Sequence, residues 1–357
     1  MAAFRPFPHG RSGEIGITRR DFAQGAAVTA ALCLVPGAAW SADTAYLRIA
    51  TGPVSGTYFA IGGLIASAVS SPTGAELCQG RADCPASGLV LVAQSTNGSS
   101  ENVDLIMSGA MESGLVQADV AYWRYMGQWT YRGLKPARTL RLVASLFTEA
   151  IHVVVRKDAK IQSIEDLRGK RVSFGAVGSG TELDARVILG GAGLTEQDVA
   201  AWRLSPAGAV DEFVKGNIDA MIVVAGPPAA WLSELFSTAA SRGPAIAVIP
   251  IEGNVAQRIQ AAYPFYGPAV IPADAYPGVK ATATLGVSAL WLVSATVKEE
   301  TVYAITRALW DEKARADLDG GHPQGRKIQL RDALRGRLLP LHPGAERYYR
   351  EKGLIAG

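Results

Sequence analysis

The chain has 357 residues, of which 48% are hydrophobic and 19% are charged, and its formal net charge is +3 at pH 7. This mixture of apolar and charged residues excludes a disordered chain, a collagen-like repeat and a small disulfide-rich protein. The 35 basic residues are nearly balanced by 32 acidic ones, and basic runs interleaved with aromatics are missing, which argues against nucleic-acid binding. The length exceeds what one hydrophobic core usually serves, so two lobes are expected.

The N-terminal residues have the pattern of an export signal. Arg19 and Arg20 precede an apolar run of small residues over 25–35, which Pro36 ends. The run is shorter than the ~20 residues that span a bilayer, as in a secretory signal, and the paired arginines resemble a twin-arginine signal. We predict that residues 1–42 are removed and that the rest is a soluble periplasmic protein. An ordinary N-terminal helix is the alternative.

Two cysteines follow this segment, Cys78 and Cys84, in a short loop that also contains Gly80. In an oxidising compartment such a loop could close a disulfide. Metal binding is the alternative, but two thiols without a nearby histidine make a poor zinc site. We favour the disulfide and expect neither a metal nor a cofactor.

The next part of the chain alternates short β-branched runs with longer amphipathic runs, which is typical of α/β layers. The predicted elements are a strand at 46–51, a helix at 57–70, a strand at 89–94, a helix at 99–107, a strand at 115–117, a helix at 119–126 and an apolar run at 140–147. Repeated passage from strand to helix favours a parallel sheet, because parallel neighbours need a crossover helix.

The same alternation begins again after Glu149. The predicted elements are strands at 151–155, 171–174, 219–224, 245–251 and 286–293, and helices at 164–168, 181–189, 209–215, 227–236 and 299–314. We therefore predict an α/β fold of two lobes, each a mainly parallel sheet flanked by helices. Lobe I would contain residues 43–147 plus 294–357, and lobe II residues 148–293.

Glycines and small hydroxyl residues gather where predicted strands pass into helices. The three loops are Thr-Gly-Pro-Val-Ser-Gly-Thr-Tyr at 51–58, Ser-Thr-Asn-Gly-Ser-Ser-Glu-Asn at 95–102 and Phe-Gly-Ala-Val-Gly-Ser-Gly-Thr at 174–181. Ligands of open α/β sheets bind at the carboxyl ends of strands, where unpaired N–H groups and the helix dipole attract anions. Such loops can also be simple turns and caps. Their presence on both predicted lobes favours a small carboxylate held between them.

Catalytic constellations are scarce in the sequence. It contains no phosphate-binding glycine motif and no Gly-x-Ser-x-Gly elbow. His152 lies in an apolar strand and is predicted to be a core histidine. Glu149 and His152 are the two groups near the lobe junction that an enzyme could use as a base. We predict a binding protein, not an enzyme.

Several motifs resemble the TAXI family, the solute receptors of tripartite ATP-independent periplasmic (TRAP) transporters. The C-terminal Pro-Leu-His-Pro-Gly-Ala-Glu-Arg-Tyr-Tyr at 340–349 is the most specific match. The other matching segments lie at 51–58, 98–102, 166–170, 178–181 and 219–220.

The resemblance implies a two-lobed periplasmic-binding-protein fold, type II-like and monomeric. Such a receptor closes around a small organic anion, amino-acid-like or dicarboxylic, and delivers it to a membrane permease driven by an ion gradient. A sensor subunit for the same ligands, or an enzyme on the same scaffold, is the alternative. The ligand-binding residues expected from the resemblance are Gly56, Thr57, Tyr58, Thr96, Asn97, Gly98, Ser99, Gln117, Ser179, Gly180, Thr181, Gly226 and Pro227.

Overall fold

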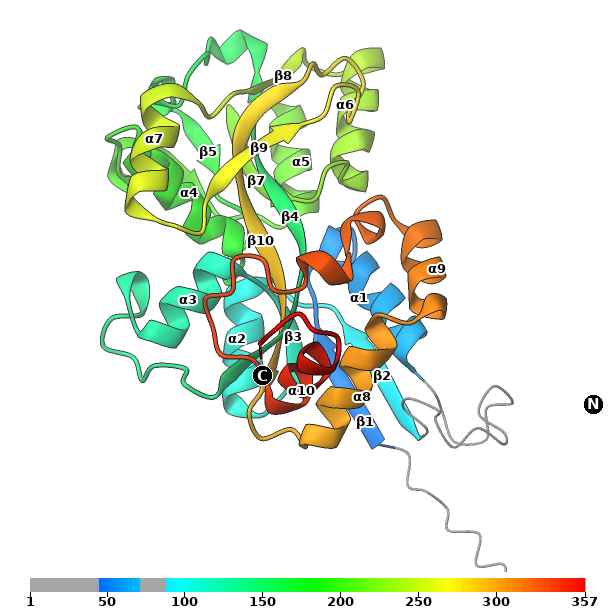
Figure 1. Cartoon of the computed structure of the whole chain (residues 1–357). Helices are drawn as coiled ribbons and strands as arrows, with labels where there is room; N and C mark the ends of the chain where they lie inside the picture. Colours follow the sequence, from blue (N-terminus) through cyan, green and yellow to red (C-terminus); the bar gives the residue numbers. More distant parts are fainter. Residues whose placement is uncertain (1–44, 71–87, 357) are drawn as a thin grey trace, which may run out of the picture. The chain divides into compact units, whose positions relative to one another are not determined.

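The structure is a computed structural model that describes residues 45–70 and 88–356 (Figure 1). Two of the sequence predictions concern other residues. The export signal over 1–42 and the disulfide between Cys78 and Cys84 lie outside the described residues. In the part of the chain that is described, no helix is both long enough and apolar enough to cross a bilayer.

The described residues form a ten-stranded mixed sheet in the order β2-β1-β3-β10-β4-β7-β5-β6, with β8 paired to β4 and β9 paired to β10. The strands are β1 (Ala45–Ala50), β2 (Leu89–Gln94), β3 (Ser113–Gln117), β4 (Leu140–Arg156), β5 (Arg171–Ser173), β6 (Ala200–Trp202), β7 (Ala220–Ala225), β8 (Ile246–Ile249), β9 (Gly267–Ile271) and β10 (Thr282–Ser294). Pairing is parallel within β2-β1-β3 and within β7-β5-β6, and antiparallel at β4 and β10.

Helices pack against the strands at both ends of this sheet. They are α1 (Thr57–Val69), α2 (Ser99–Ser108), α3 (Ala118–Met126), α4 (Gly180–Gly191), α5 (Pro206–Lys215), α6 (Ala230–Arg242), α7 (Gly253–Ala262), α8 (Glu299–Leu309), α9 (Glu312–Gly321) and α10 (Pro343–Glu351). Helices α1 to α3 contact β1 to β3, whereas α4 and α5 contact β7. The predicted α/β class, with a sheet flanked by helices, is confirmed.

Strand β4 differs from its prediction, because the runs at 140–147 and 151–155 are one continuous strand. Thr148 and Glu149 interrupt the apolar pattern, which predicted a break. The strand continues because β10 pairs with it across this point, where Thr148 is opposite Ser288 and Glu149 opposite Val287. Figure 1 shows β4 and β10 running together from the elements around β1–β3 to those around β5–β7.

The predicted helix at 299–314 is two helices, α8 and α9. The Asp311 side chain accepts a hydrogen bond from Ala314 N at 2.8 Å and thereby caps a new helix. An N-cap aspartate satisfies one of the N–H groups that a helix start leaves unpaired. The sequence signal for the break is Asp311 itself, which the prediction placed inside one helix.

Three further differences come from short or weakly patterned segments. Strand β6, helix α7 and strand β9 were not predicted, and these elements have only three, ten and five residues. Helix α6 begins at Ala230, three residues after its predicted start. Pro227 and Pro228 precede it, and a residue before proline is disfavoured in the helical conformation.

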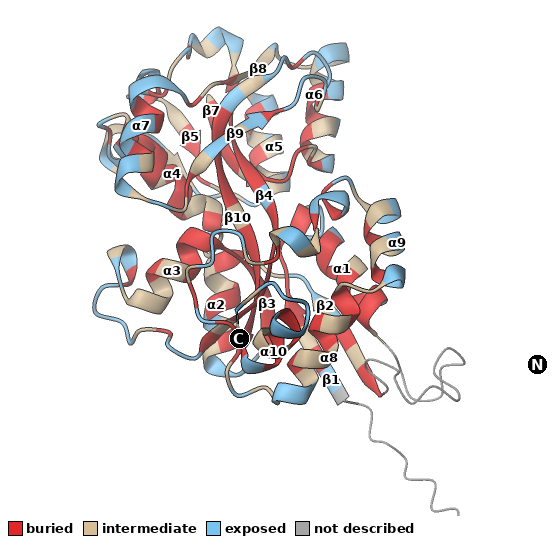
Figure 2. Ribbon diagram, viewed as in Figure 1, coloured by how far each residue is buried: buried red, intermediate tan, exposed pale blue. Residues whose placement is uncertain are grey.

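The C-terminal residues pack on the elements around β1–β3. Helices α8 and α9 contact α1, and α10 contacts α8 and β4. Tyr349 is fully buried, and its hydroxyl donates to the carbonyl oxygen of Val143 at 2.9 Å. His342 begins α10, where its side chain accepts from Gly344 N at 3.2 Å. The motif at 340–349 is therefore structural in the present fold. Figure 2 shows the buried residues along β4 and β10.

Candidate functional site

A cavity of about 110 Å³ lies at the carboxyl ends of strands from both ends of the sheet order. A single water needs only ~10–15 Å³ on this measure, so the cavity has room for a small metabolite. Ten of the thirteen predicted site residues line it. These ten are Gly56, Thr57, Tyr58, Asn97, Gly98, Ser99, Gln117, Ser179, Gly180 and Thr181. The binding of a ligand by these residues stays a prediction.

The other three predicted residues, Thr96, Gly226 and Pro227, are not among the residues that line the cavity. The Thr96 hydroxyl donates to Asn102 Oδ1 at 2.6 Å and so holds the turn before α2. A Cβ at Gly226 would lie 2.5 Å from the side chain of Gln324, whose amide donates to the carbonyl oxygen of Pro227. These contacts give the three residues structural roles beside the cavity.

Four helices have an N-cap residue that lines this cavity. Their N-cap residues are Gly56 of α1, Gly98 of α2, Gln117 of α3 and Ser179 of α4, and all four line the cavity. At α1, α2 and α3 no side chain of the N-cap residue accepts a hydrogen bond from the first turn. A helix start leaves N–H groups without intrahelical partners and carries about half a positive charge. At α4 one of these groups, Glu182 N, donates to Ser179 Oγ, and at α2 Glu101 N donates to the carbonyl oxygen of Gly178. Helix starts that converge in this way form a binding site for an anion.

The first turn of α2 and the loop before α4 touch each other beside the cavity. Glu101 N donates to the carbonyl oxygen of Gly178 at 3.0 Å. A Cβ at Gly180 would lie 1.3 Å from Gln117 Oε1 and 3.0 Å from Ser99 Oγ, so only glycine allows this approach without movement of Gln117. The elements on the two sides of the cavity, α2 and the start of α3 on one side and the start of α4 on the other, are therefore in contact.

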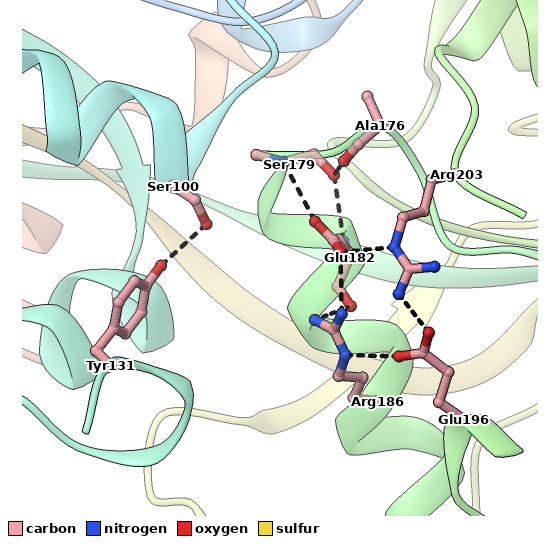
Figure 3. Close-up of polar contacts among 9 residues, drawn as sticks. Ser100, Tyr131, Ala176, Ser179, Glu182, Arg186, Glu196 and Arg203 are labelled. Carbon is pink, nitrogen blue, oxygen red and sulfur yellow. Dashed lines mark hydrogen bonds and ion pairs between the residues drawn. The ribbon is translucent and has the colours of Figure 1, made fainter. Parts of the chain in front are cut away.

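A charged network holds the start of α4 in place (Figure 3). Glu182 Oε1 accepts from Arg186 at 3.0 Å and from Arg203 at 2.9 Å, while its Oε2 accepts from Gly178 N at 3.2 Å. Both arginines also bond Glu196. The network fixes the loop from outside, so that these arginines support the cavity wall without lining it.

Glu149 is the one residue with an ionisable carboxyl among those that line the cavity, and none of the lining residues is Lys, Arg or His. Tyr58 donates its hydroxyl to Glu149 Oε2 at 2.6 Å. Burial raises the pKa of Glu149 to about 8, because the ionised form loses solvation. The sequence analysis named Glu149 only as a candidate base. Its position, as a polar residue inside an apolar run, was the available signal.

One wall of the cavity is apolar and was not predicted. It contains Leu204, Pro206, Met221, Val223 and Trp231. These residues come from β7, from the starts of α5 and α6, and from the loop before α5. Their sequence pattern is that of ordinary core residues, so no sequence signal distinguishes them as cavity residues.

A buried acidic cluster joins helices from the two sides of the cavity. The Tyr266 hydroxyl lies 2.9 Å from Asp119 Oδ2 of α3 and 2.6 Å from Asp184 Oδ1 of α4. Both carboxyls are fully buried. Burial raises the pKa of Asp119 to about 6, and burial together with the charge of Asp119 raises that of Asp184 well above its usual range. The sequence analysis missed these three residues.

His152 has the surroundings of a core histidine. It is fully buried, its Nδ1 lies 2.9 Å from the Ala150 carbonyl oxygen and its Nε2 lies 2.9 Å from the Tyr276 hydroxyl. Burial lowers its pKa to about 4. His152 does not line the cavity. Within the described residues, no group of three or more His, Cys, Asp or Glu side chains is arranged to hold a metal ion.

The fold and the cavity define an α/β protein that can hold a small molecule at converging helix N-termini. The chain belongs to the NMT1-like family, whose sequence model matches residues 49–353. The resemblance to the TAXI receptors stays a prediction beside this family membership.

Solved structures similar to this chain include a Bordetella protein and an Escherichia coli protein. A protein from Bordetella bronchiseptica RB50 is similar with a TM-score of 0.50 and 17% identity, over 87% of this chain and 82% of that chain. The periplasmic aliphatic sulphonate binding protein SsuA from Escherichia coli is similar with a TM-score of 0.41 and 17% identity, over 85% of this chain and 78% of that chain. At these identities the first likeness shows the fold alone.

Proposed function

We propose that this protein is a periplasmic solute receptor that binds a small organic anion, amino-acid-like or dicarboxylic, in the cavity. The observation that carries the proposal is the convergence of four helix N-termini on one cavity. Uncapped N–H groups and helix dipoles bind a carboxylate without a basic side chain. The protein then binds its solute and does not transform it.

We further propose that the cavity opens and closes between two lobes, residues 43–147 plus 294–357 and residues 148–293. Strands β4 and β10 are the main connections between these residue groups. Bending of two connecting strands is a common way for such halves to close around a ligand.

The partner of such a receptor is a membrane permease driven by an ion gradient, as in TRAP transporters. The motif at 340–349 and the glycine loops support this proposal through their resemblance to TAXI receptors. The export signal over 1–42 would place the receptor in the periplasm as a monomer. An enzyme on the same scaffold is the alternative. Of its two candidate bases, the buried, hydrogen-bonded His152 does not line the cavity, whereas Glu149 does.

Thermal unfolding of the exported protein tests the receptor proposal. A panel of amino acids and of mono- and dicarboxylic acids should contain compounds that raise the melting temperature, because ligands that bind only the folded state stabilise it. The variant Gln117→Ala should lose this rise, since Gln117 lines the cavity. The control Gln128→Ala changes an exposed glutamine elsewhere and should keep it. No rise with any compound in the panel would contradict the proposal.

A further inference from the structure

We propose that Glu149 determines specificity by pairing with a cationic group of the solute, so that the ligand is an ammonium-bearing carboxylic acid. The inference rests on the proposed receptor function and names its ligand class more closely. It also gives a role to the one ionisable carboxyl of the cavity.

The charges around the cavity are the first argument. The described residues that line it include one acid, Glu149, and no Lys, Arg or His. The arginines nearest to the start of α4, Arg186 and Arg203, are engaged by Glu182 and Glu196 behind the wall. Helix N-termini can hold one carboxylate, but a second anionic group beside Glu149 would have no basic partner and would require Glu149 to keep its proton. A dicarboxylate therefore fits the cavity less well than a zwitterion.

The hydrogen bonds of Glu149 are the second argument. Tyr58 occupies Oε2 at 2.6 Å. The other oxygen, Oε1, has no hydrogen-bond partner among the described residues. It is also not one of the side-chain oxygen and nitrogen atoms that are both without a partner and completely buried. It is therefore open to the cavity that Glu149 lines. A buried carboxylate needs a donor for this oxygen, and an ammonium supplies both the hydrogen and the compensating charge.

The position of Glu149 relative to the helix starts is the third argument. Gly56, Gly98, Gln117 and Ser179 line the same cavity of about 110 Å³ as Glu149. One small molecule can therefore reach both the helix starts and Glu149. Its carboxylate would lie at the helix starts and its ammonium at Glu149. Leu204 and Trp231 would contact the rest of the molecule, which favours an apolar or short side chain.

The protonation of Glu149 predicts opposite changes of affinity with pH for two classes of ligand. With its pKa raised to about 8 by burial, Glu149 is largely neutral at pH 6 in the absence of ligand. An ammonium ligand needs the ionised form, so its affinity should rise between pH 6 and pH 8, by up to ~10-fold per pH unit. A ligand that accepts a hydrogen bond from the neutral carboxyl should instead bind more weakly as the pH rises.

The other titratable groups that act on Glu149 do not change this comparison. They are Tyr58 from α1, Asp119 from α3 and Asp184 from α4. When ionised, the two aspartates would also favour an ammonium over an uncharged group, so they add to the pH slope with the same sign as Glu149. Neither aspartate lines the cavity. Glu149→Gln leaves both in place, so the part of the slope that is lost in this variant belongs to Glu149.

The experiment is calorimetric titration of the exported protein with matched pairs: L-leucine with 4-methylpentanoate, and L-glutamate with glutarate. Each is measured at pH 6, 7 and 8, against the wild type, Glu149→Gln and the control Glu165→Gln, whose side chain is exposed. We expect an amino acid to bind the wild type at least ~30-fold more tightly than its deaminated partner, because breaking a buried charged pair is costly. Glu149→Gln should remove that preference, and Glu165→Gln should retain it.

The outcomes separate this inference from the proposed function. Deaminated acids that bind as tightly as amino acids, or wild-type affinity for the amino acid that falls as the pH rises, would overturn the role of Glu149 and leave the receptor function in place. If neither these compounds nor the wider acid panel binds, both proposals fail. The wild-type pH slope requires no variant, so its sign tests the role of Glu149 even if Glu149→Gln does not fold.

Discussion

The hydroxyl of Tyr266 has one hydrogen but lies within hydrogen-bond distance of two carboxyls, those of Asp119 and Asp184. It can donate to only one of them at a time. The other contact is between two oxygen atoms and needs a further proton, which one of the carboxyls must carry. This count agrees with the raised pKa of both aspartates.

The shared proton predicts how stability depends on pH. The pKa of Asp119 rises on folding from its usual value of 3.8 to about 6, so the folded state binds a proton that the unfolded state has lost. The stabilising effect is complete below pH 3.8 and is lost as the pH rises through 6. Asp119→Asn stays uncharged and avoids this loss. Relative to the wild type, its free energy of unfolding should therefore increase between pH 4 and pH 6, by at most ~1.4 kcal/mol per pH unit.

Urea unfolding of both proteins across this pH range measures the difference. Asp274→Asn is the matched control, because Asp274 is exposed and its side chain makes no hydrogen bond with a described residue. Asparagine also tolerates the positive φ of 60° at this position. A difference between Asp119→Asn and the wild type that stays constant with pH would show that the cluster holds no additional proton.

For individual residues, the sequence predicted the loops around the cavity but not the buried acidic cluster. The three loops rich in glycine and hydroxyl residues contain nine of the predicted residues that line the cavity, and the tenth, Gln117, was expected only from the family resemblance. Asp119, Asp184 and Tyr266 could not be predicted, because they meet only through the packing of α3, α4 and the segment before β9. The residues of the apolar wall were also missed, because their sequence pattern is that of core residues and only the folded structure places them at the cavity.

Among the elements, α4 offers a direct test of packing through two adjacent glycines. Gly190 is exposed, and a Cβ there would meet nothing within 4 Å. Gly191 is buried, and a Cβ there would lie 2.6 Å from the Ile259 side chain of α7 and 3.2 Å from that of Val255. Gly191→Ala should therefore lose ~1–3 kcal/mol of stability through overpacking.

Gly190→Ala is its matched partner and should gain ~0.5–1 kcal/mol, because alanine favours a helix more than glycine does. Both are measured as free energies of urea unfolding. Equal effects of the two substitutions would mean that α4 and α7 do not pack in this way.

Element boundaries were predictable where local pattern and capping agree. The strand at 89–94 has the predicted bounds, and α1 and α2 end within one residue of prediction. Strand β4 was split in the prediction because Glu149 is polar, yet its bond from Tyr58 makes the burial acceptable. Helix α7 was missed because its burial depends on α4. Long-range partners thus decide the elements that sequence pattern alone assigns wrongly.

For the described molecule as a whole, closure of the two predicted lobes would form the contact between the first turn of α2 and the loop before α4, and opening would break it. Glu101 lies in the predicted lobe I and Gly178 in lobe II, and their backbones are joined at 3.0 Å. A Cβ at Gly178 would lie 3.6 Å from the Cβ of Glu101. Disulfides join Cβ atoms that are ~3.5–4.5 Å apart. The pair Glu101→Cys with Gly178→Cys should therefore cross-link in the closed form.

Closure around a solute predicts that ligand accelerates this cross-link. A closed form populated at about 1–10% without ligand would give ~10-fold or faster bond formation when a solute that raises the melting temperature is added. The positive φ of 82° at Gly178 strains a cysteine there, by ~1–2 kcal/mol, without preventing the bond. Peptide mapping by mass spectrometry, with Glu101→Cys alone as the control, identifies the 101–178 link. A cross-linking rate that does not change with solute would contradict closure, because a solute held between two moving lobes must bring positions 101 and 178 together.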